Sequence, residues 1–309
     1  MPLDIQAKTS LEKRKEAGIP GQHEVTPEEA RRMQEAQPRI PGPEIGSIAD
    51  IKIQGTHGNI PIRIYTPEGT GPFPIAMWFH GGGWVIGNIE TNDSTCRALA
   101  KESESIIISV DYKLAPENKF PIPFDDCYEA TCWAYENAHT FNGNEKKLAV
   151  AGASAGGNLA AAVSLKARDE NRPSIIHQTL VYPVTDYNFS YSSYEECKEG
   201  YGLEYDTMVY FWDSYLSKAE DQYNPYAVPM RASTLNNLPP AFILTVEYDP
   251  LRDEGEAYAT ALEAANVKVK YSLYEGMIHA FFNAGVPFDK TWDAISEVCS
   301  ELKKAFGTT

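Results

Sequence analysis

The sequence lacks an apolar run long enough to cross a membrane, and it lacks a paired-cysteine framework. No stretch of its 309 residues approaches the roughly 20 apolar residues that a transmembrane helix needs. Its five cysteines are an odd number, and none has the C-x-x-C spacing of metal or redox sites. The first residues also lack the basic segment followed by an apolar one that marks a secretory signal. These absences predict a soluble, cytoplasmic protein with reduced cysteines and no metal site.

Positive charge is scarce as well. The chain has 27 Lys and Arg against 43 Asp and Glu, a formal net charge of −16. Nucleic acids and anionic lipids bind proteins by exchanging counterions for basic side chains, so we expect neither as a partner. The acidic residues are spread along the whole chain, which is typical of a solubility device and says little about a substrate.

From about residue 48 onward, β-branched runs alternate with helical patterns. Such alternation predicts an α/β fold with a mostly parallel central sheet of about eight strands, flanked by helices. The first two strands show an alternating pattern that favours an antiparallel entrance. The predicted strands are residues 48–53, 60–65, 74–79, 106–110, 148–151, 175–181, 241–246 and 267–273.

Two segments do not fit the alternation. Residues 1–45 are charged and helical in places, and residues 187–226 are rich in Tyr and Trp and far longer than a usual loop. We expect both to form a helical cap over the mouth of the sheet. The predicted division is therefore residues 1–45 as the first part of the cap, 46–186 as the first part of the core, 187–226 as the cap insertion, and 227–309 as the second part of the core.

The pentapeptide Gly152-Ala153-Ser154-Ala155-Gly156 lies between a short apolar run and an alanine-rich helical stretch. This strand, turn and helix context is the one in which G-x-S-x-G presents a nucleophilic serine. The flanking glycines permit a sharp turn that larger residues would resist. The pattern predicts Ser154 as a nucleophile.

A glycine triplet supplies a candidate oxyanion hole. His80-Gly81-Gly82-Gly83-Trp84 directly follows a predicted strand. Glycines leave backbone N–H groups unobstructed, and acyl transfer needs such donors where a carbonyl oxygen becomes an oxyanion. We expect the N–H groups of Gly81, Gly82 and Ala155 to form the hole.

A carboxylate and an imidazole follow the serine in the chain. Asp249 lies just beyond the predicted strand 241–246, and His279 follows the next one, so both should reach the carboxyl edge of the sheet with Ser154. Asp253 and Glu254 are nearby alternatives to Asp249, but they begin a helix, where acidic residues favourably meet the helix dipole.

These segments resemble the hormone-sensitive lipase family of carboxylesterases, within the α/β-hydrolase superfamily. The matching stretches are His80 to Trp84, Asp111 to Glu117, Gly152 to Ala160, Tyr182-Pro183, Asp249 to Asp253 and Gly276 to Phe281. The resemblance implies the α/β-hydrolase fold, hydrolysis of short- to medium-chain acyl esters, and no cofactor. It also implies Ser154, Asp249 and His279 as the catalytic triad. His80 borders the glycine triplet in the sequence, and from that position we expect it to shape the loop by hydrogen bonding and not to act as the base.

Two positions depart from the family pattern. Ala153 stands where Asp or Thr is usual, and Lys113 stands where Arg is common. Lysine lacks the planar guanidinium of arginine, so a structural ion pair would be looser. Neither change touches the predicted triad.

Other functions use the same residues. A small-molecule receptor on this fold would bind a ligand without forming an acyl-enzyme, and a peptidase or a long-chain lipase would use the same triad. The residues leave the physiological substrate, acyl length, alcohol preference, stereoselectivity and oligomeric state open. The last predicted strand, between Val267 and Leu273, is an edge that a twofold homodimer could pair.

Overall fold

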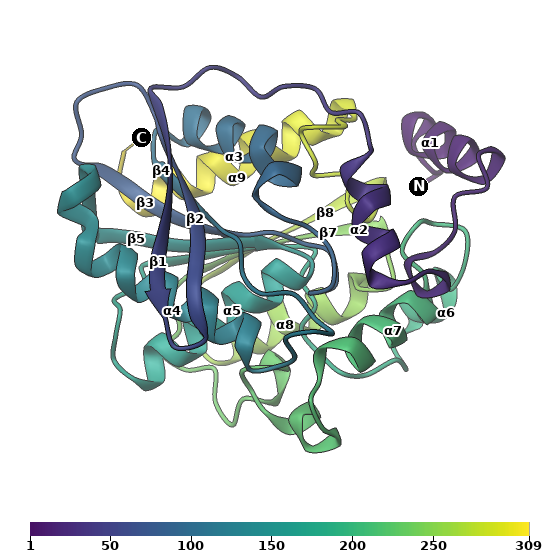
Figure 1. Cartoon of the computed structure of the whole chain (residues 1–309). Coiled ribbons are helices and arrows are strands. Elements are labelled where there is room, and N and C mark those ends of the chain that lie inside the picture. The colour runs from purple at the N-terminus through teal and green to yellow at the C-terminus, as the bar shows by residue number, and fades with distance from the viewer. Residues whose placement is uncertain (309) are drawn as a thin grey trace.

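A computed structural model describes residues 1–308 and contains one eight-stranded sheet (Figure 1). Its strand order is β1-β2-β4-β3-β5-β6-β7-β8. The strands are β1 (Ser47–Gly55), β2 (Gly58–Thr66), β3 (Phe73–Phe79), β4 (Ile106–Val110), β5 (Gly143–Ala153), β6 (His177–Val181), β7 (Ala241–Tyr248) and β8 (Val269–Ile278). β2 runs antiparallel to both β1 and β4, and all later pairs are parallel. The predicted fold class and the antiparallel entrance are confirmed.

Helices cover both faces of the sheet. α3 (Ile89–Ser103) and α9 (Asp289–Phe306) lie on one face, and α4 (Ile122–Asn137), α5 (Ala155–Asp169) and α8 (Arg252–Ala264) lie on the other (Figure 1). Strand β3 shows why the two layers form: Ile75, Met77 and Phe79 join one buried cluster, while Ala76 and Trp78 join the other. Successive side chains of a strand point to opposite faces, so an entirely apolar strand is buried on both.

Several strands extend beyond their predicted limits, and β5 and β8 do so furthest. β5 begins at Gly143, where it already pairs with β3. The prediction started it at Leu148 because the residues before Leu148 are polar. β8 runs on to Ile278 across an irregularity in its pairing with β7. α3 starts at Ile89, where the side chain of Asn88 accepts a hydrogen bond from the N–H of Thr91 and caps the helix.

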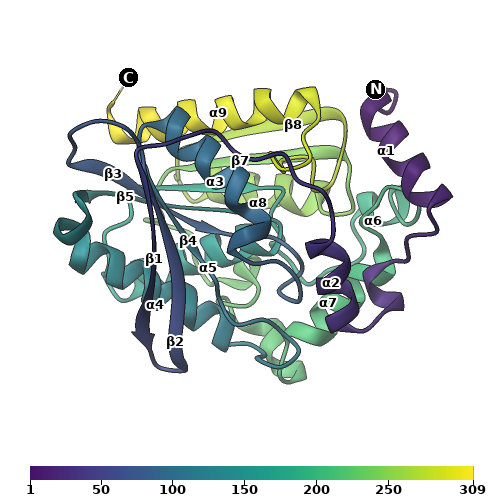
Figure 2. The same ribbon diagram turned by 45° about the horizontal axis from the view of Figure 1, so that its top comes forward.

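The remaining helices gather at one end of the sheet (Figure 2). They are α1 (Ile5–Glu16), α2 (Pro27–Glu35), α6 (Ser192–Glu196) and α7 (Tyr205–Tyr215), with the short 3₁₀ turns η1 (Gln22–Glu24), η3 (Ala219–Tyr223) and η4 (Pro229–Arg231); another such turn, η2 (Ala138–Phe141), follows α4. His23 and Thr207 join η1 to α7 through a side-chain hydrogen bond of 2.8 Å. Thus two segments that are far apart in the sequence lie side by side.

None of the helices within residues 1–308 is both long enough and apolar enough to span a bilayer.

Candidate active site

Ser154 occupies the turn between β5 and α5. Its backbone has φ 57° and ψ −121°, a conformation that an L-residue adopts only under constraint. Its N–H donates to the carbonyl of Val181 at 2.9 Å, which holds the turn against β6. Its side chain is thereby directed away from the strand and remains 7% exposed.

The glycines on either side of Ser154 are needed for space. A Cβ on Gly156 would overlap the carbonyl oxygen of Phe79, and a Cβ on Gly152 would overlap the carbonyl of Gly156. The positive φ lies at Ser154 itself and at neither of these two glycines. Glycine is required at the two predicted positions, and the physical reason is close approach of neighbouring backbone.

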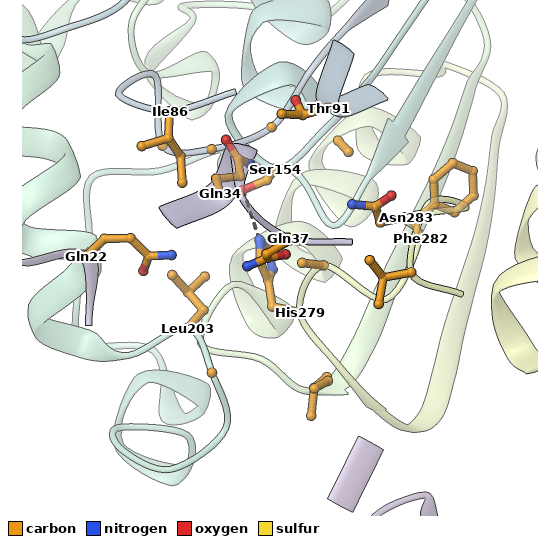
Figure 3. A pocket seen from close by; sticks show the side chains of 18 of the residues that line it. Gln22, Gln34, Gln37, Ile86, Thr91, Ser154, Leu203, His279, Phe282 and Asn283 are labelled. Carbon is orange, nitrogen blue, oxygen red and sulfur yellow. Dashed lines mark hydrogen bonds between the residues drawn. The ribbon is translucent and has the colours of Figure 1, made fainter. Parts of the chain in front are cut away.

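His279 and Asp249 complete a hydrogen-bonded chain with Ser154. His279 follows β8 directly, and its Nε2 lies 2.9 Å from Ser154 Oγ (Figure 3). Its Nδ1 lies 2.7 Å from Oδ2 of Asp249, which follows β7 directly. The carboxylate is fully buried, and its Oδ1 accepts a hydrogen bond from the N–H of Leu251 at 2.9 Å. The three side chains come from three different strands and meet at one edge.

The glycine loop after β3 lies against this serine. A Cβ on Gly81 would stand 3.3 Å from Ser154 Cβ and 2.9 Å from the carbonyl of Ala153, so only glycine allows this approach. Within residues 1–308, the amides of Gly81, Gly82 and Ala155 donate none of the backbone hydrogen bonds that close turns and loops. These N–H groups remain available to a ligand beside Ser154.

The two alternative carboxylates turn away from His279. Asp253 accepts from the N–H of Ser193 at 2.8 Å and pairs with the guanidinium of Arg252. Glu254 is fully buried, and burial raises its pKa to about 8. Both residues hold the chain around α6, and Asp249 is the carboxylate that contacts the imidazole.

His80 shapes the glycine loop from beneath. Its Nδ1 donates to the carbonyl of Gly81 at 2.8 Å, and its ring stacks on Tyr112 with centroids 4.2 Å apart. Burial lowers the pKa of His80 to about 4, so the imidazole is neutral at ordinary pH. A neutral, fully buried ring in this place supports the loop and is not the base that contacts Ser154.

The two departures from the family pattern have different surroundings. Lys113 forms an ion pair with the buried carboxylate of Asp126, with Nζ 3.1 Å from each oxygen, so this pair is intact despite the missing guanidinium. Ala153 is buried among apolar residues on the face of the sheet that packs against α3 and α9. Neither side chain takes part in the hydrogen-bonded chain of Ser154, although Ala153 lines the cavity beside it.

A cavity of about 310 Å³ opens above Ser154 and His279. Most of the residues that line this cavity were not predicted from the sequence. They include residues of α3 and of the loop after His279, and a wall from the N-terminal segment that contains Arg14, Gln22, Gln34 and Gln37. No local pattern marks these residues, because their role depends on where the segment packs. Residues 1–308 hold no group of three or more His, Cys, Asp or Glu side chains placed to bind a metal ion.

Comparison with known proteins identifies the family of this chain. A family profile described as the α/β hydrolase fold matches residues 76–283. The arylesterase of Saccharolobus solfataricus is 41% identical over 246 residues, covering 79% of this chain and 80% of that protein. The carboxylesterase NlhH of Mycobacterium tuberculosis is 37% identical over 251 residues, covering 80% and 79% of the two chains.

Solved structures of esterases share the fold of this chain. A thermostable esterase from Pseudomonas putida has a TM-score of 0.95 at 35% identity and covers 99% of this chain and 98% of its own. An ester hydrolase from the metagenome of Lake Arreo has a TM-score of 0.94 at 38% identity, covering 99% of both chains. The chain therefore belongs to the α/β hydrolase family, and the expected relationship to the carboxylesterases of the hormone-sensitive lipase group is confirmed.

Proposed function

We propose that the chain hydrolyses carboxylic esters with short to medium acyl chains, using Ser154 as nucleophile, His279 as general base and acid, and Asp249 as the group that orients the imidazole. One observation carries this proposal: the hydrogen-bonded chain from Ser154 Oγ through His279 to Asp249, with spacings of 2.9 and 2.7 Å. The names of the relatives, arylesterase and carboxylesterase, support ester hydrolysis. The cavity volume of about 310 Å³ supports small acyl groups.

The reaction proceeds in two acyl-transfer steps. His279 Nε2 accepts the Ser154 proton as Oγ attacks the ester carbonyl, and it then gives that proton to the departing alcohol. Water attacks the resulting acyl-enzyme in the same way, so that the acid is released and the serine is restored. Asp249 accepts the hydrogen bond from Nδ1, which keeps the proton off Nε2 and stabilises the imidazolium that forms.

The oxyanion of each tetrahedral intermediate binds the N–H groups of Gly81, Gly82 and Ala155. Fixed donors stabilise developing charge without reorganising, and loss of one such donor lowers kcat by about 100- to 1000-fold in other hydrolases. The close approach of Gly81 to Ser154 supports this role, because a Cβ there would stand 3.3 Å from the serine Cβ.

The segments 1–45 and 187–226 form the cap of this enzyme. Their helices α1, α2, α6 and α7 gather at the end of the sheet where Ser154 lies (Figure 2). Residues of both segments, among them Gln34 and Leu203, line the cavity. The cap therefore selects the substrate, while the core performs the chemistry.

The proposal is tested by comparing the wild type with Ser154→Ala on p-nitrophenyl esters from acetate to palmitate, and on a peptide p-nitroanilide. We expect rapid turnover of short and medium esters, and a folded variant whose kcat is lower by several orders of magnitude, because the triad acts as a unit. Near-normal turnover by Ser154→Ala would contradict the assignment. Cleavage of the peptide but of no ester would favour a peptidase, and absence of turnover would favour a receptor.

We also propose that two copies of the chain pair through β8. This strand is the last in the sheet order, and Leu273 on it is 40% exposed. An unpaired edge is a template for a second strand, and a twofold axis pairs the edge with itself. Sedimentation velocity should find a dimer that Leu273→Lys weakens and that Tyr223→Lys, at a distant exposed aromatic residue, leaves intact. A monomer at all concentrations would contradict the pairing.

A cytoplasmic location is part of the proposal. The five cysteines are all free thiols in the structure, and a reducing compartment preserves them in that state. Cell fractionation tests this location.

A further inference from the structure

The N-terminal wall of the cavity carries three glutamine side chains that have no partner in the protein. Gln22 on η1, Gln34 on α2 and Gln37 just after α2 line the cavity, and Figure 3 shows them around Ser154 and His279. Within residues 1–308, none of the three side-chain amides makes a hydrogen bond to another residue, and the bonds at Gln34 and Gln37 use their backbone groups alone. Their donors and acceptors are therefore available to whatever fills the cavity.

A fourth amide faces the same space from the opposite side. Oδ1 of Asn283, in the loop after His279, accepts a hydrogen bond from the N–H of Gly285 at 2.9 Å. This bond fixes the orientation of the amide and leaves its Nδ2 as a donor. Figure 3 shows this nitrogen directed toward Ser154 and His279.

The polar side chains that α3 contributes to the wall already form hydrogen bonds within the protein. Thr91 donates to the carbonyl of Asn88 at 2.8 Å, and Asn92 accepts from the indole of Trp78 at 3.2 Å. Thr95 accepts from the N–H of Ala284 at 3.1 Å. Among these lining amides, unused hydrogen-bonding groups are thus found on the three glutamines and on Nδ2 of Asn283.

The charge of the cavity walls restricts the class of ligand further. The chain has 43 Asp and Glu residues, yet none of them lines the cavity, and Arg14 is the one permanently charged side chain among the lining residues. The cavity therefore offers no counter-ion to a cationic substrate. It offers chiefly neutral amides, each with both donors and an acceptor.

We propose that this cavity selects esters that carry a hydroxyl group near the scissile bond, and that Gln22, Gln34 and Gln37 are the residues that determine this preference. The inference rests on the proposed ester hydrolysis. A plain alkyl chain would displace water from the half-buried amides of Gln22 and Gln34 and leave them unpaired, whereas a hydroxyl replaces the water with a direct hydrogen bond. Gln37 is exposed, and its amide offers a further partner at the edge of the cavity. A site that is built to bond a hydroxyl discriminates against the analogue that lacks it.

The test uses two pairs of esters with equal numbers of heavy atoms. 2-Hydroxyethyl acetate is compared with propyl acetate for the alcohol part, and ethyl 3-hydroxypropanoate with ethyl butanoate for the acyl part. Each kcat/KM is divided by the rate of alkaline hydrolysis of the same ester, which removes differences in intrinsic reactivity. We expect the hydroxylated member to be favoured at least about fivefold in one pair, the effect of roughly one net hydrogen bond.

Near-isosteric variants assign the preference to residues. Gln22→Met, Gln34→Met and Gln37→Met remove the amide and keep the side-chain length. We expect at least one of them to lower the ratio of the two normalised kcat/KM values, hydroxylated ester over alkyl ester, by about 2- to 10-fold. The control is Gln54→Met, the same change on the exposed surface of β1 outside the cavity, which should leave the ratio unchanged.

Two results would overturn the inference: equal or slower normalised rates for the hydroxylated members of both pairs, or a preference that survives all three substitutions together. In both cases turnover of p-nitrophenyl acetate would continue, and the proposed function would stand. If the wild type hydrolysed no ester at all, the proposed function and the inference would fail together. Thermal unfolding of each variant shows that the ratios are measured on folded protein.

Discussion

The guanidinium of Arg31 on α2 donates from Nε to the backbone carbonyl of Val85, 2.8 Å away, just after the glycine loop. The same group donates to the carbonyl of Ala115 at 2.9 Å and makes a bidentate pair with Glu117. The N–H of Ala115 in turn donates to the carbonyl of Trp84 at 2.8 Å. One side chain of the N-terminal segment thus ties the end of the glycine loop to the loop at Ala115.

Replacing Arg31 with Lys should lower kcat by about tenfold or more, with a smaller change in KM. A lysine carries one compact ammonium and cannot bond two carbonyls and a bidentate carboxylate together. Small shifts of positioned donors lower rates steeply. Steady-state kinetics on p-nitrophenyl acetate measure the effect. Arg32→Lys, at an exposed neighbour, is the control, and equal kinetics for the two variants would remove Arg31 from this role.

Glu254 joins the proposed cap insertion to α8. Its Oε1 accepts from the N–H of Thr185 at 2.7 Å, and its Oε2 accepts from the hydroxyl of Tyr194 on α6 at 3.0 Å. Burial, the largest cause, raises the pKa of this carboxyl from 4.5 to about 8. The folded protein therefore keeps a proton that the unfolded chain has already lost above about pH 4.5.

The stability of the protein should therefore decrease as the pH rises through the window from about 4.5 to 8, since the folded state binds the extra proton there. Glu254→Gln keeps an acceptor for Thr185 and cannot ionise. We expect the variant to match the wild type near pH 5 and to exceed its free energy of unfolding by roughly 2 to 4 kcal/mol at pH 8. Denaturant unfolding at the two pH values measures this. A variant less stable than the wild type at pH 8 would show that the buried carboxylate is favourable as an anion.

Gly156→Ala should prevent normal folding of the turn at Ser154. The new Cβ would overlap the carbonyl oxygen of Phe79 and lie 2.6 Å from that of His80, and neither backbone group can move without displacing β3. Overpacking typically costs about 1 to 3 kcal/mol, and a clash with fixed backbone on two sides puts this variant at about 3 kcal/mol or more. Yield of folded protein and thermal unfolding give the measurement.

The matched control for that change is Gly18→Ala. Gly18 has φ 60° and no atom within 4 Å of the added Cβ, so alanine there meets backbone strain without a clash. We expect a loss of about 1 kcal/mol for this variant. If both variants lost the same stability, close approach at the turn would not be what requires glycine at position 156.

Removing the cation from the Lys113–Asp126 pair should destabilise the protein by about 3 to 5 kcal/mol, because it leaves a buried carboxylate without its partner. Lys113→Met makes this change and keeps the apolar stem. The double variant Lys113→Met, Asp126→Asn also removes the charge, and it should recover much of the loss. Equal stability of the single and double variants would mean that water solvates Asp126 in the absence of Lys113.

The strands of the core could be predicted because the residues that mark each strand and its turn are neighbours in the sequence. The apolar run ending at Phe79 and the glycines after it lie together in the sequence, and so do β5 and the turn at Ser154. The positions of Asp249 and His279 followed from one rule, that parallel strands bring their carboxyl ends to the same edge. The structure places both residues directly after β7 and β8.

The walls of the cavity could not be predicted in the same way. Gln34 and Gln37 have the composition of any exposed helix end, and only the packing of α2 against the loops at Val85 and Ala115 gives them a cavity to face. Glu254 was expected to stabilise a helix start, and its burial against Thr185 depends on contacts 69 positions away. Such roles arise from tertiary packing, which short sequence patterns do not report.

The three hydrogen-bonded side chains at the sheet edge come from residues 154–279, whereas the glutamines that face them come from residues 22–37. This separation makes the N-terminal segment an exchangeable module. Evolution, or a protein engineer, can exchange this segment and so change the substrate of the enzyme. The replacement needs an arginine in the place of Arg31, which bonds the carbonyls of Val85 and Ala115.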